Sequence, residues 1–239
     1  MLDDWRYEPA RDLGLPSRQR VQSLRREVGL AGACSCLAWR WLTRVYLFAA
    51  HRLDIRGREN LPLEPPFVLV ANHSSHLDAI ALATAMPVRH VGRVFPIAAG
   101  DTFFTKPASS IFATACMNAL PIWRKNCGAH SLDDLRSRLV EDRCVYILFP
   151  EGTRTRTGEV GTFKPGLGRL VAGTKTAVVP CHLQGAWHAL PPNRSLPRPT
   201  KIVLNIGAPL QFENAANQRD GWNTVAQATE AAVRMLGAA

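Results

Sequence analysis

Two short segments of this sequence combine residue types that can do chemistry. Residues 72–78 read NHSSHLD and follow the apolar run FVLVA, while residues 149–158 read FPEGTRTRTG and follow the apolar run CVYIL. Short apolar runs bounded by such polar segments are typical of buried strands. Open α/β sheets bind their ligands beyond the carboxyl ends of the strands, so both segments are candidates for one site.

The first segment offers a histidine and a carboxylate, His73 and Asp78. Five positions on a regular helix place two side chains about 140° apart, so the pair can meet only if His73 precedes a helix that begins near Asp78. Asp78 would then hold one imidazole nitrogen while the other takes a proton from a hydroxyl, as in general base catalysis. In a second interpretation, Ser75 and Asp78 form a capping box and His73 is a polar loop residue. The spacing leaves both interpretations open.

The second segment is rich in groups that bind phosphate. Its glycines, threonines and arginines supply backbone N–H groups, hydroxyls and guanidinium forks. The alternative is a surface loop with solvated arginines. Neither a GxSxG elbow nor a P-loop occurs in the sequence, which argues against a serine hydrolase of the usual type and a P-loop nucleotidase.

Together the two segments resemble blocks I and III of the phospholipid and glycerol acyltransferase family, which includes the 1-acylglycerol-3-phosphate acyltransferases. Three further stretches are similar to the family pattern: NALPIWR at residues 118–124 resembles the end of block II, FKPG at 163–166 the stretch after block III, and VVPCHLQG at 178–185 block IV. The similarity covers about residues 56–210. It implies an α/β fold and an O-acyltransferase that uses an acyl thioester.

The resemblance also implies roles for individual residues. His73 would be the general base and Asp78 its orienting partner, and the substrate-binding residues would be Arg124, Glu151, Gly152, Thr153, Arg154 and Lys164. Trp123 stands where the family usually has an aspartate, and residues 98–101 read AAGD where many members have a Lys-x-Glu-Leu run. Because block II is associated with the acceptor, an alcohol without phosphate stays open beside a lysophospholipid.

An acyl thioester is already activated, so a hydroxyl deprotonated by His73 can attack it directly, without a covalent acyl-enzyme. We expect backbone amides near His73 to stabilise the oxyanion, and no metal or nucleotide cofactor. The expected partners are acyl-CoA or an acyl-carrier protein as donor, a lysolipid acceptor and a membrane surface, but no nucleic acid. Two other functions remain: a thioester hydrolase that uses the same base, and a non-catalytic basic protein that binds anionic lipid or nucleic acid.

The charge balance agrees with an anionic partner. Lys and Arg number 29 against 19 Asp and Glu, giving a net charge of +10 that attracts phosphates, nucleic acid or an anionic membrane. With 46% hydrophobic residues, the composition is globular and excludes disordered and collagen-like classes. The six cysteines form no CxxC pair, so neither a zinc site nor a disulfide framework is expected.

Residues 31–50 are apolar and aromatic but carry Arg40 and Arg44 near the middle, which disfavours a transmembrane span. Leu37, Trp41, Val45 and Phe48 fall on one helical stripe. The stripe predicts either an interfacial helix or a helix that packs on the protein's own core. Arg18, Arg20, Arg25 and Arg26 would add attraction to anionic lipid. The expected location is the cytoplasmic face of the inner (plasma) membrane, with peripheral or monotopic attachment.

These segments require an α/β fold to position them, with a mixed central sheet flanked by helices and an N-terminal amphipathic helical segment. We predict a helical segment over residues 1–56 and one acyltransferase α/β domain over 57–239. Strands are expected at 67–71, 144–149, 177–183 and 202–206, and helices at 76–86, 109–119, 131–142, 166–172 and 222–236.

Overall fold

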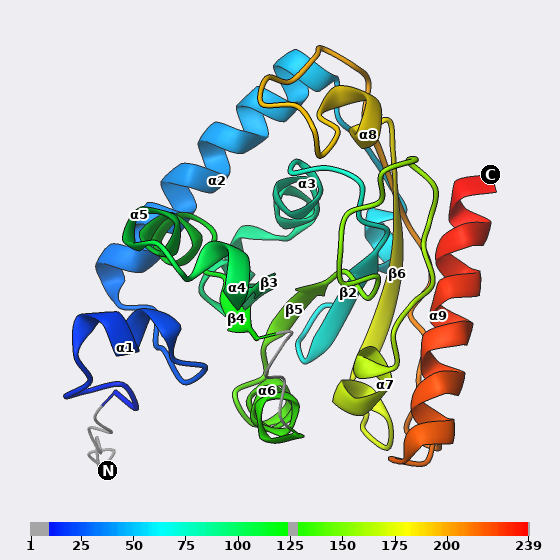
Figure 1. Ribbon diagram of the computed structural model, residues 1–239. Helices are drawn as coiled ribbons and strands as arrows, with labels where there is room; N and C mark the ends of the chain where they lie inside the picture. The colour runs from blue at the N-terminus through cyan, green and yellow to red at the C-terminus, as the bar shows by residue number, and fades with distance from the viewer. Residues whose placement is uncertain (1–9, 124–128, 239) are drawn as a thin grey trace, which may run out of the picture.

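A seven-stranded sheet forms the centre of the computed structural model, which describes residues 10–123 and 129–238 (Figure 1). The strand order is β1-β7-β6-β2-β5-β3-β4, and every neighbouring pair is parallel except β6 and β7. The sheet is therefore mixed, as expected. The strands are β1 Asp54–Arg56, β2 Phe67–Ala71, β3 Val94–Ala99, β4 Leu120–Ile122, β5 Val145–Leu148, β6 Ala177–Gln184 and β7 Val203–Ile206.

Helices cover both faces of the sheet (Figure 1). One face packs against α2 Leu30–His51, α3 Asp78–Ala85 and α8 Ala186–Ala189, and the other against α6 Ala129–Glu141, α7 Gly166–Val171 and α9 Arg219–Ala238. All five residues of β2 are buried because its alternate side chains enter the two opposite cores. The shorter elements are α1 Ser17–Gln22, η1 Arg58–Asn60, η2 Val88–Arg93, α4 Gly100–Phe103, α5 Pro107–Ile111 and η3 Phe112–Cys116.

The adjacency of β2 and β5 positions the two chemistry-bearing segments. The strands run parallel with Val70 opposite Leu148, so the loops that follow them emerge at the same edge of the sheet. Asn72 fixes the end of β2 on its other side, because its side-chain amide donates to the Leu183 carbonyl at 3.1 Å and accepts the Leu183 N–H at 2.8 Å. The fold thus brings residues 72–78 and 149–155 together.

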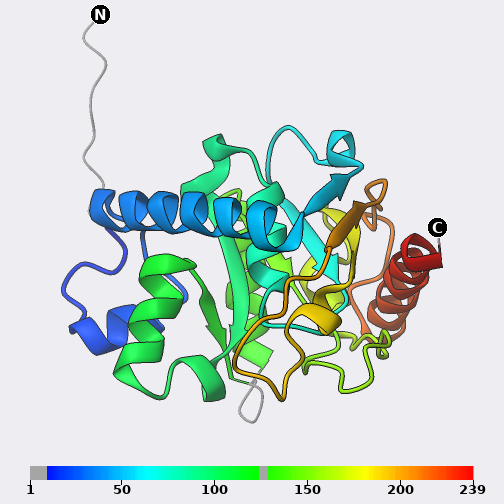
Figure 2. The ribbon, with the colours of Figure 1, turned by 90° about the horizontal axis from the view of Figure 1, so that it is seen from above.

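The N-terminal segment is part of the same packed structure. Helix α2 runs across one side of the molecule and packs against α3, with Cys36, Leu47 and His51 buried (Figure 2). Strand β1 pairs with β7, so the three residues just before the expected boundary at residue 57 form an edge of the sheet. No helix in the described ranges is long and apolar enough to cross a membrane.

Four strands confirm the sequence predictions to within two residues at either end: β2, β5, β6 and β7. The strands β1, β3 and β4 were not expected. In β3 the run VFPIAA is interrupted by Pro96, which lacks the N–H that a central strand needs. The structure accommodates it because β3 pairs with β5 over Val94–Pro96 and with β4 only from Ile97 onward.

The expected helices are present, with one change. The predicted helix at residues 109–119 is α5, which ends at Ile111 and continues as the π-helical turn η3. The Thr114 hydroxyl donates to the carbonyls of Ser110 at 2.8 Å and Ile111 at 3.1 Å. Such bonds compete with the backbone ladder of a regular helix, so they favour the irregular turn.

Candidate active site

His73 and Asp78 form a hydrogen-bonded pair beyond the end of β2. The Nδ1 atom of His73 lies 2.9 Å from Oδ2 of Asp78, whose side chain is 0% exposed, whereas the His73 side chain is 22% exposed. The same oxygen accepts the backbone N–H groups of Ser74 and Ser75, each at 2.7 Å. Helix α3 begins at Asp78, so the carboxylate also acts at its N-terminus. One carboxylate oxygen therefore holds both the His73 ring and the turn that leads into α3.

The environment of His73 fixes which ring nitrogen is available. A carboxylate accepts only, so Nδ1 carries the proton and Nε2 is the basic nitrogen. Within the described part of the chain Nε2 has no hydrogen-bond partner. The imidazole stacks on the Phe149 ring with centroids 4.1 Å apart and planes at 17°. This ring is held in orientation and its free nitrogen can accept a proton from a hydroxyl.

The loop after β5 contacts the backbone of His73. Glu151 is 8% exposed, and its Oε1 accepts the His73 N–H at 2.8 Å. Burial raises the pKa of the Glu151 carboxyl, while the N–H groups of His73 and Gly161 act in the opposite direction. On the other side of the same residue, the Thr155 N–H donates to the His73 carbonyl at 2.8 Å. The sequence alone did not predict these contacts between the two segments.

The other expected substrate-binding residues lie on the same loop or beside it. Gly152 has a left-handed backbone at φ +75°, and the Lys164 ammonium lies 2.8 Å from where a Cβ at Gly152 would be. Thr153 is exposed. The Arg154 guanidinium contacts Nε2 of His76. Arg124 lies outside the described residues.

His76 is a site residue that sequence reasoning did not assign. Burial lowers its pKa, and the charge of Arg154 and the nearby His73 ring lower it further. A neutral His76 can accept a hydrogen bond from the Arg154 guanidinium, which directs that cation toward the loop carrying His73. The only signal in the sequence is a second histidine in the NHSSHLD segment, three residues after the first.

The backbone amides that were expected to stabilise an oxyanion are already used. The N–H groups of Ser74 and Ser75 donate to Asp78, and the N–H of His73 donates to Glu151. A buried N–H that serves one acceptor well is not free to serve a second. The N–H groups of residues 73–75 are therefore not free to bind an oxyanion, and the expectation of amide donors near His73 stays a prediction for other amides of the site.

Two departures from the family pattern touch one another. The Trp123 ring lies against Gly100, where an added Cβ would be 2.7 Å from ring atom Cδ2. Trp123 also packs against the small apolar cluster that contains Phe104. Because β3 and β4 are parallel neighbours, Gly100 after β3 and Trp123 after β4 meet beyond the carboxyl ends of the strands, on the same side of the sheet as the His73–Asp78 dyad.

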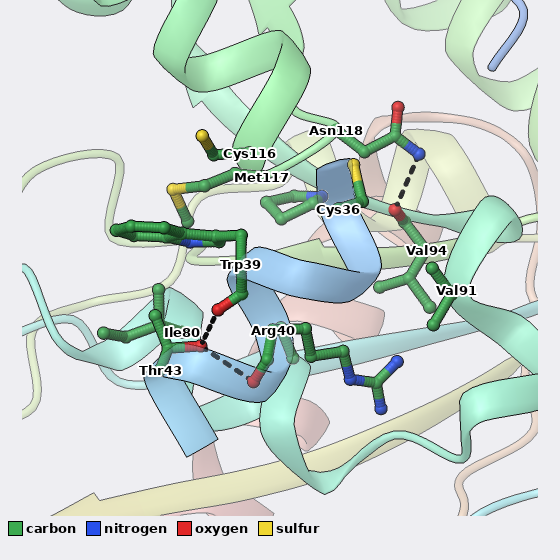
Figure 3. Close-up of a pocket in the computed structure, with 12 residues that line it drawn as sticks. Cys36, Trp39, Arg40, Thr43, Ile80, Val91, Val94, Cys116, Met117 and Asn118 are labelled. Carbon is green, nitrogen blue, oxygen red and sulfur yellow. Dashed lines mark hydrogen bonds between the residues drawn. The ribbon is translucent and has the colours of Figure 1, made fainter. Parts of the chain in front are cut away.

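An apolar hollow lies on the other flank of α3, between that helix and α2. Figure 3 shows Trp39 and Met117 along one side of it and Val91 and Val94 along the other. Ile80 of α3 also lines it, two residues after the start of the helix at Asp78. Neither His73 nor Asp78 is among the described residues that line the hollow.

Comparisons with known proteins identify the family of this chain. The acyltransferase family model matches residues 52–184. The chain is 31% identical to the chloroplastic 1-acyl-sn-glycerol-3-phosphate acyltransferase LPAT1 of Arabidopsis thaliana over 62% of this chain and 40% of that protein. It is 33% identical to the human 1-acyl-sn-glycerol-3-phosphate acyltransferase alpha over 56% of this chain and 46% of that protein. The matched stretch therefore spans less than half of either relative.

The fold resembles a solved structure as well. The crystal structure of the 1-acyl-sn-glycerophosphate (LPA) acyltransferase PlsC from Thermotoga maritima superposes with a TM-score of 0.66 at 22% sequence identity. The superposition covers 87% of this chain and 80% of that chain. The mixed α/β architecture is thus shared with a solved protein.

Proposed function

The chain belongs to the acyltransferase family, and from this premise we propose that it transfers a fatty acyl group from an acyl thioester to the hydroxyl of a 1-acylglycerol 3-phosphate or a similar lysophospholipid. The observation that carries the proposal is the 2.9 Å contact between His73 Nδ1 and the buried Asp78 carboxylate, with Nε2 of the imidazole left free. The names of the curated relatives, 1-acyl-sn-glycerol-3-phosphate acyltransferases, support the acceptor class.

The chemistry follows from that geometry. Nε2 of His73 removes the proton of the acceptor hydroxyl as its oxygen bonds to the thioester carbonyl carbon. Asp78 stabilises the imidazolium that forms, because its carboxylate faces Nδ1 from a fully buried position. When the tetrahedral intermediate collapses, the carbon–sulfur bond breaks, and the leaving thiolate takes the proton back from Nε2. The products are the acylated acceptor and the free thiol.

The positive side chains around the loop support an acceptor that carries phosphate. Arg154 and Lys164 both lie at the loop after β5, and guanidinium groups bind phosphate through two parallel hydrogen bonds. Arg124 is proposed as a second guanidinium from the resemblance alone. Thr153 is exposed in the same loop and can add a hydroxyl contact. A neutral alcohol would leave these charges without a partner.

The thioester donor is proposed to be acyl-CoA or an acyl-carrier protein. The donor is a substrate, and the His73–Asp78 dyad performs the proton transfers by itself, so we propose no metal or other cofactor. The net charge of +10 favours either donor, because both carry phosphate groups and acyl-carrier proteins are acidic partners for a basic surface.

Helix α2 is proposed to dock the enzyme on the cytoplasmic face of the inner membrane. One face of α2 packs on α3 through buried residues such as Leu47, yet Leu37, Trp41, Val45 and Phe48 are exposed on another face. The packed face agrees with the interpretation of α2 as a core helix, and the exposed stripe supports the proposal that α2 also docks on a membrane. An exposed apolar stripe with arginines beside it favours the interface of an anionic bilayer.

One of the upstream arginines does not take part in this docking surface. Arg26 is buried, and its guanidinium donates to the Asn118 side chain at 2.9 Å and to the Ala119 carbonyl at 3.1 Å. Burial lowers its pKa to about 10. The expectation that Arg26 attracts anionic lipid is therefore wrong.

The test of the proposed function is an acceptor panel. Full-length protein is incubated with acyl-CoA, or with an acylated carrier protein, in the presence and absence of lysolipids, and the products are identified by mass spectrometry. Release of the free thiol that depends on a lysolipid and yields the diacyl product is the expected result. Release that is independent of any acceptor identifies a hydrolase. No release with either donor rejects both enzymatic functions.

A further inference from the structure

We propose that Glu151 is a positioning residue that holds His73 in place, and that it does not bind the acceptor. The inference rests on the proposed function, in which His73 is the general base. The family resemblance of the FPEGTR segment implies that Glu151 binds the acceptor, whereas we assign to it the positioning of His73.

The loop after β5 holds His73 at three places. The Glu151 carboxylate accepts the His73 N–H at 2.8 Å, and the Thr155 N–H donates to the His73 carbonyl at 2.8 Å. The Phe149 ring stacks on the imidazole with centroids 4.1 Å apart. Both peptide groups of His73 and its ring are thus fixed by one loop, while Asp78 fixes Nδ1 from the other side. Glu151 is the ionisable side chain among these contacts of the loop.

The carboxylate of Glu151 is buried against the backbone of His73 and Gly161. Its second contact is the N–H of Gly161, and Oε2 lies 2.8 Å from where a Cβ at Gly161 would be. The side chain is 8% exposed. An acceptor could reach these oxygens only by displacing a backbone N–H, which would leave a buried donor unpaired.

Charge supports the same assignment. The proposed acceptor carries a phosphate, and an ionised Glu151 would repel it, whereas the neighbouring Arg154 and Lys164 would attract it. Two N–H donors are the natural partners of a buried carboxylate. Glu151 therefore holds the backbone of His73 in place, and the cations beside it bind the acceptor phosphate.

The distinction is measurable because positioning and acceptor binding change different kinetic constants. Displacing a general base by about 1 Å costs on the order of 100-fold in rate, even when the bound substrate is unaffected. A lost acceptor contact that is equal in the ground and transition states raises KM and leaves kcat unchanged. Loss of Glu151 should therefore lower kcat and leave the acceptor KM almost the same.

Three variants test this. Glu151→Gln replaces one carboxylate oxygen by an NH₂ that faces a backbone N–H, and Gly161→Ala places a methyl group 2.8 Å from Oε2 without altering the FPEGTR segment. Glu159→Gln is the matched control, an exposed glutamate in the same loop. We expect Glu151→Gln and Gly161→Ala to lower kcat by about 100-fold and about 10-fold, with the acceptor KM within twofold of the wild-type value. The double variant should be no slower than Glu151→Gln alone, since both changes act on one contact.

Hydrogen–deuterium exchange of the amides of His73 and Gly161 provides a readout that needs no turnover. At least one of the two amides should exchange faster in Glu151→Gln than in the wild type and the Glu159→Gln control, because the glutamine keeps only one acceptor oxygen. An acceptor KM raised tenfold or more in Glu151→Gln at unchanged kcat would overturn the proposal, as would wild-type exchange at both amides. If the wild type transfers no acyl group to any acceptor, the proposed function fails, whereas the exchange measurement still decides whether Glu151 holds the loop. If Glu151→Gln does not fold, Gly161→Ala gives the same kinetic comparison.

Discussion

Replacing Asp78 by asparagine removes one charge from the centre of the proposed site and changes little else in size. The amide oxygen of Asn can take the place of Oδ2, where it still accepts the N–H groups of Ser74 and Ser75 and the Nδ1–H of His73. The NH₂ group then takes the place of Oδ1, which is buried and has no hydrogen-bond partner among the described residues. The substitution therefore tests the charge rather than the hydrogen-bond geometry.

The two effects of the substitution have separate magnitudes. A hydrogen bond to a charged acceptor contributes about 1 kcal/mol more than one to a neutral acceptor, so the two backbone bonds lose about 2 kcal/mol of stability. For a chain of this size that free energy lowers Tm by about 4 to 8 °C. The imidazolium loses its buried counter-ion. In a Ser–His–Asp triad the same exchange lowers kcat by about 10⁴-fold, partly through the wrong imidazole tautomer, so about 10⁴-fold is the upper bound expected here. Activity should thus fall far more than stability.

The assay measures product formation by mass spectrometry at saturating donor and acceptor, with thermal melting recorded on the same samples. Asp134→Asn on α6 is the matched control, because Asp134 is exposed and far along the chain from the site. His73→Ala should be inactive with a Tm close to wild type, and Asp78→Asn in the His73→Ala background should cause no further loss. If folded Asp78→Asn keeps more than a tenth of the wild-type kcat, the assignment of Asp78 as the partner of the base is refuted.

Three further predictions concern the acceptor, the membrane and pH. Arg154→Lys should raise the KM for a phosphate-bearing acceptor and leave the donor KM unchanged, because a lysine lacks the guanidinium fork. Arg156→Lys in the same exposed loop is the control. Equal acceptor KM values in both variants would contradict the proposal that Arg154 binds the acceptor phosphate. Trp41→Ser, which alters a side chain 67% exposed on α2, should weaken co-sedimentation with anionic vesicles and high salt should weaken it further, whereas Met235→Ser, also 67% exposed but on α9, should not. Burial lowers the pKa of His51 in the folded protein. The neutral imidazole therefore stabilises the fold above the ordinary pKa of about 6.5, and this stability is lost as the pH falls through the lower pKa of the folded state. Melting curves from pH 7 to pH 4 should show a smaller decrease of Tm in His51→Gln than in the wild type.

The sequence predicted four of the five interior strands, all except β3 with its Pro96, and neither of the two edge strands. Strand β2 is five consecutive apolar residues, and a run of that kind is buried in almost any α/β arrangement. Strands β1 and β4 have three residues each, and they form because β7 and β3 already offer them a free edge. That edge is a product of the whole fold, so no local pattern in a three-residue segment can predict it.

The site shows the same division between local and long-range information. The pairing of His73 with Asp78 could be predicted because both residues lie within one turn and one helix start, six positions of chain in all. The contact between Glu151 and the His73 backbone spans 78 positions and depends on the parallel pairing of β2 with β5. The family pattern marks Glu151 as important, but only the fold determines which atoms it touches.

The contacts of Asp78 connect the start of α3 with the proposed base. Its carboxylate is favoured by the helix dipole and accepts two backbone N–H groups of the turn before the helix, so helix and turn together hold Asp78 where it is. The turn before the helix then leaves His73 beside that carboxylate, with its ring against Phe149. The five-residue spacing is thus the length of the turn that joins the end of β2 to the start of α3, and the carboxylate that closes this turn also orients the base. It follows that a substitution at Asp78 cannot be purely catalytic, and its kinetic effect has to be read together with its cost in stability.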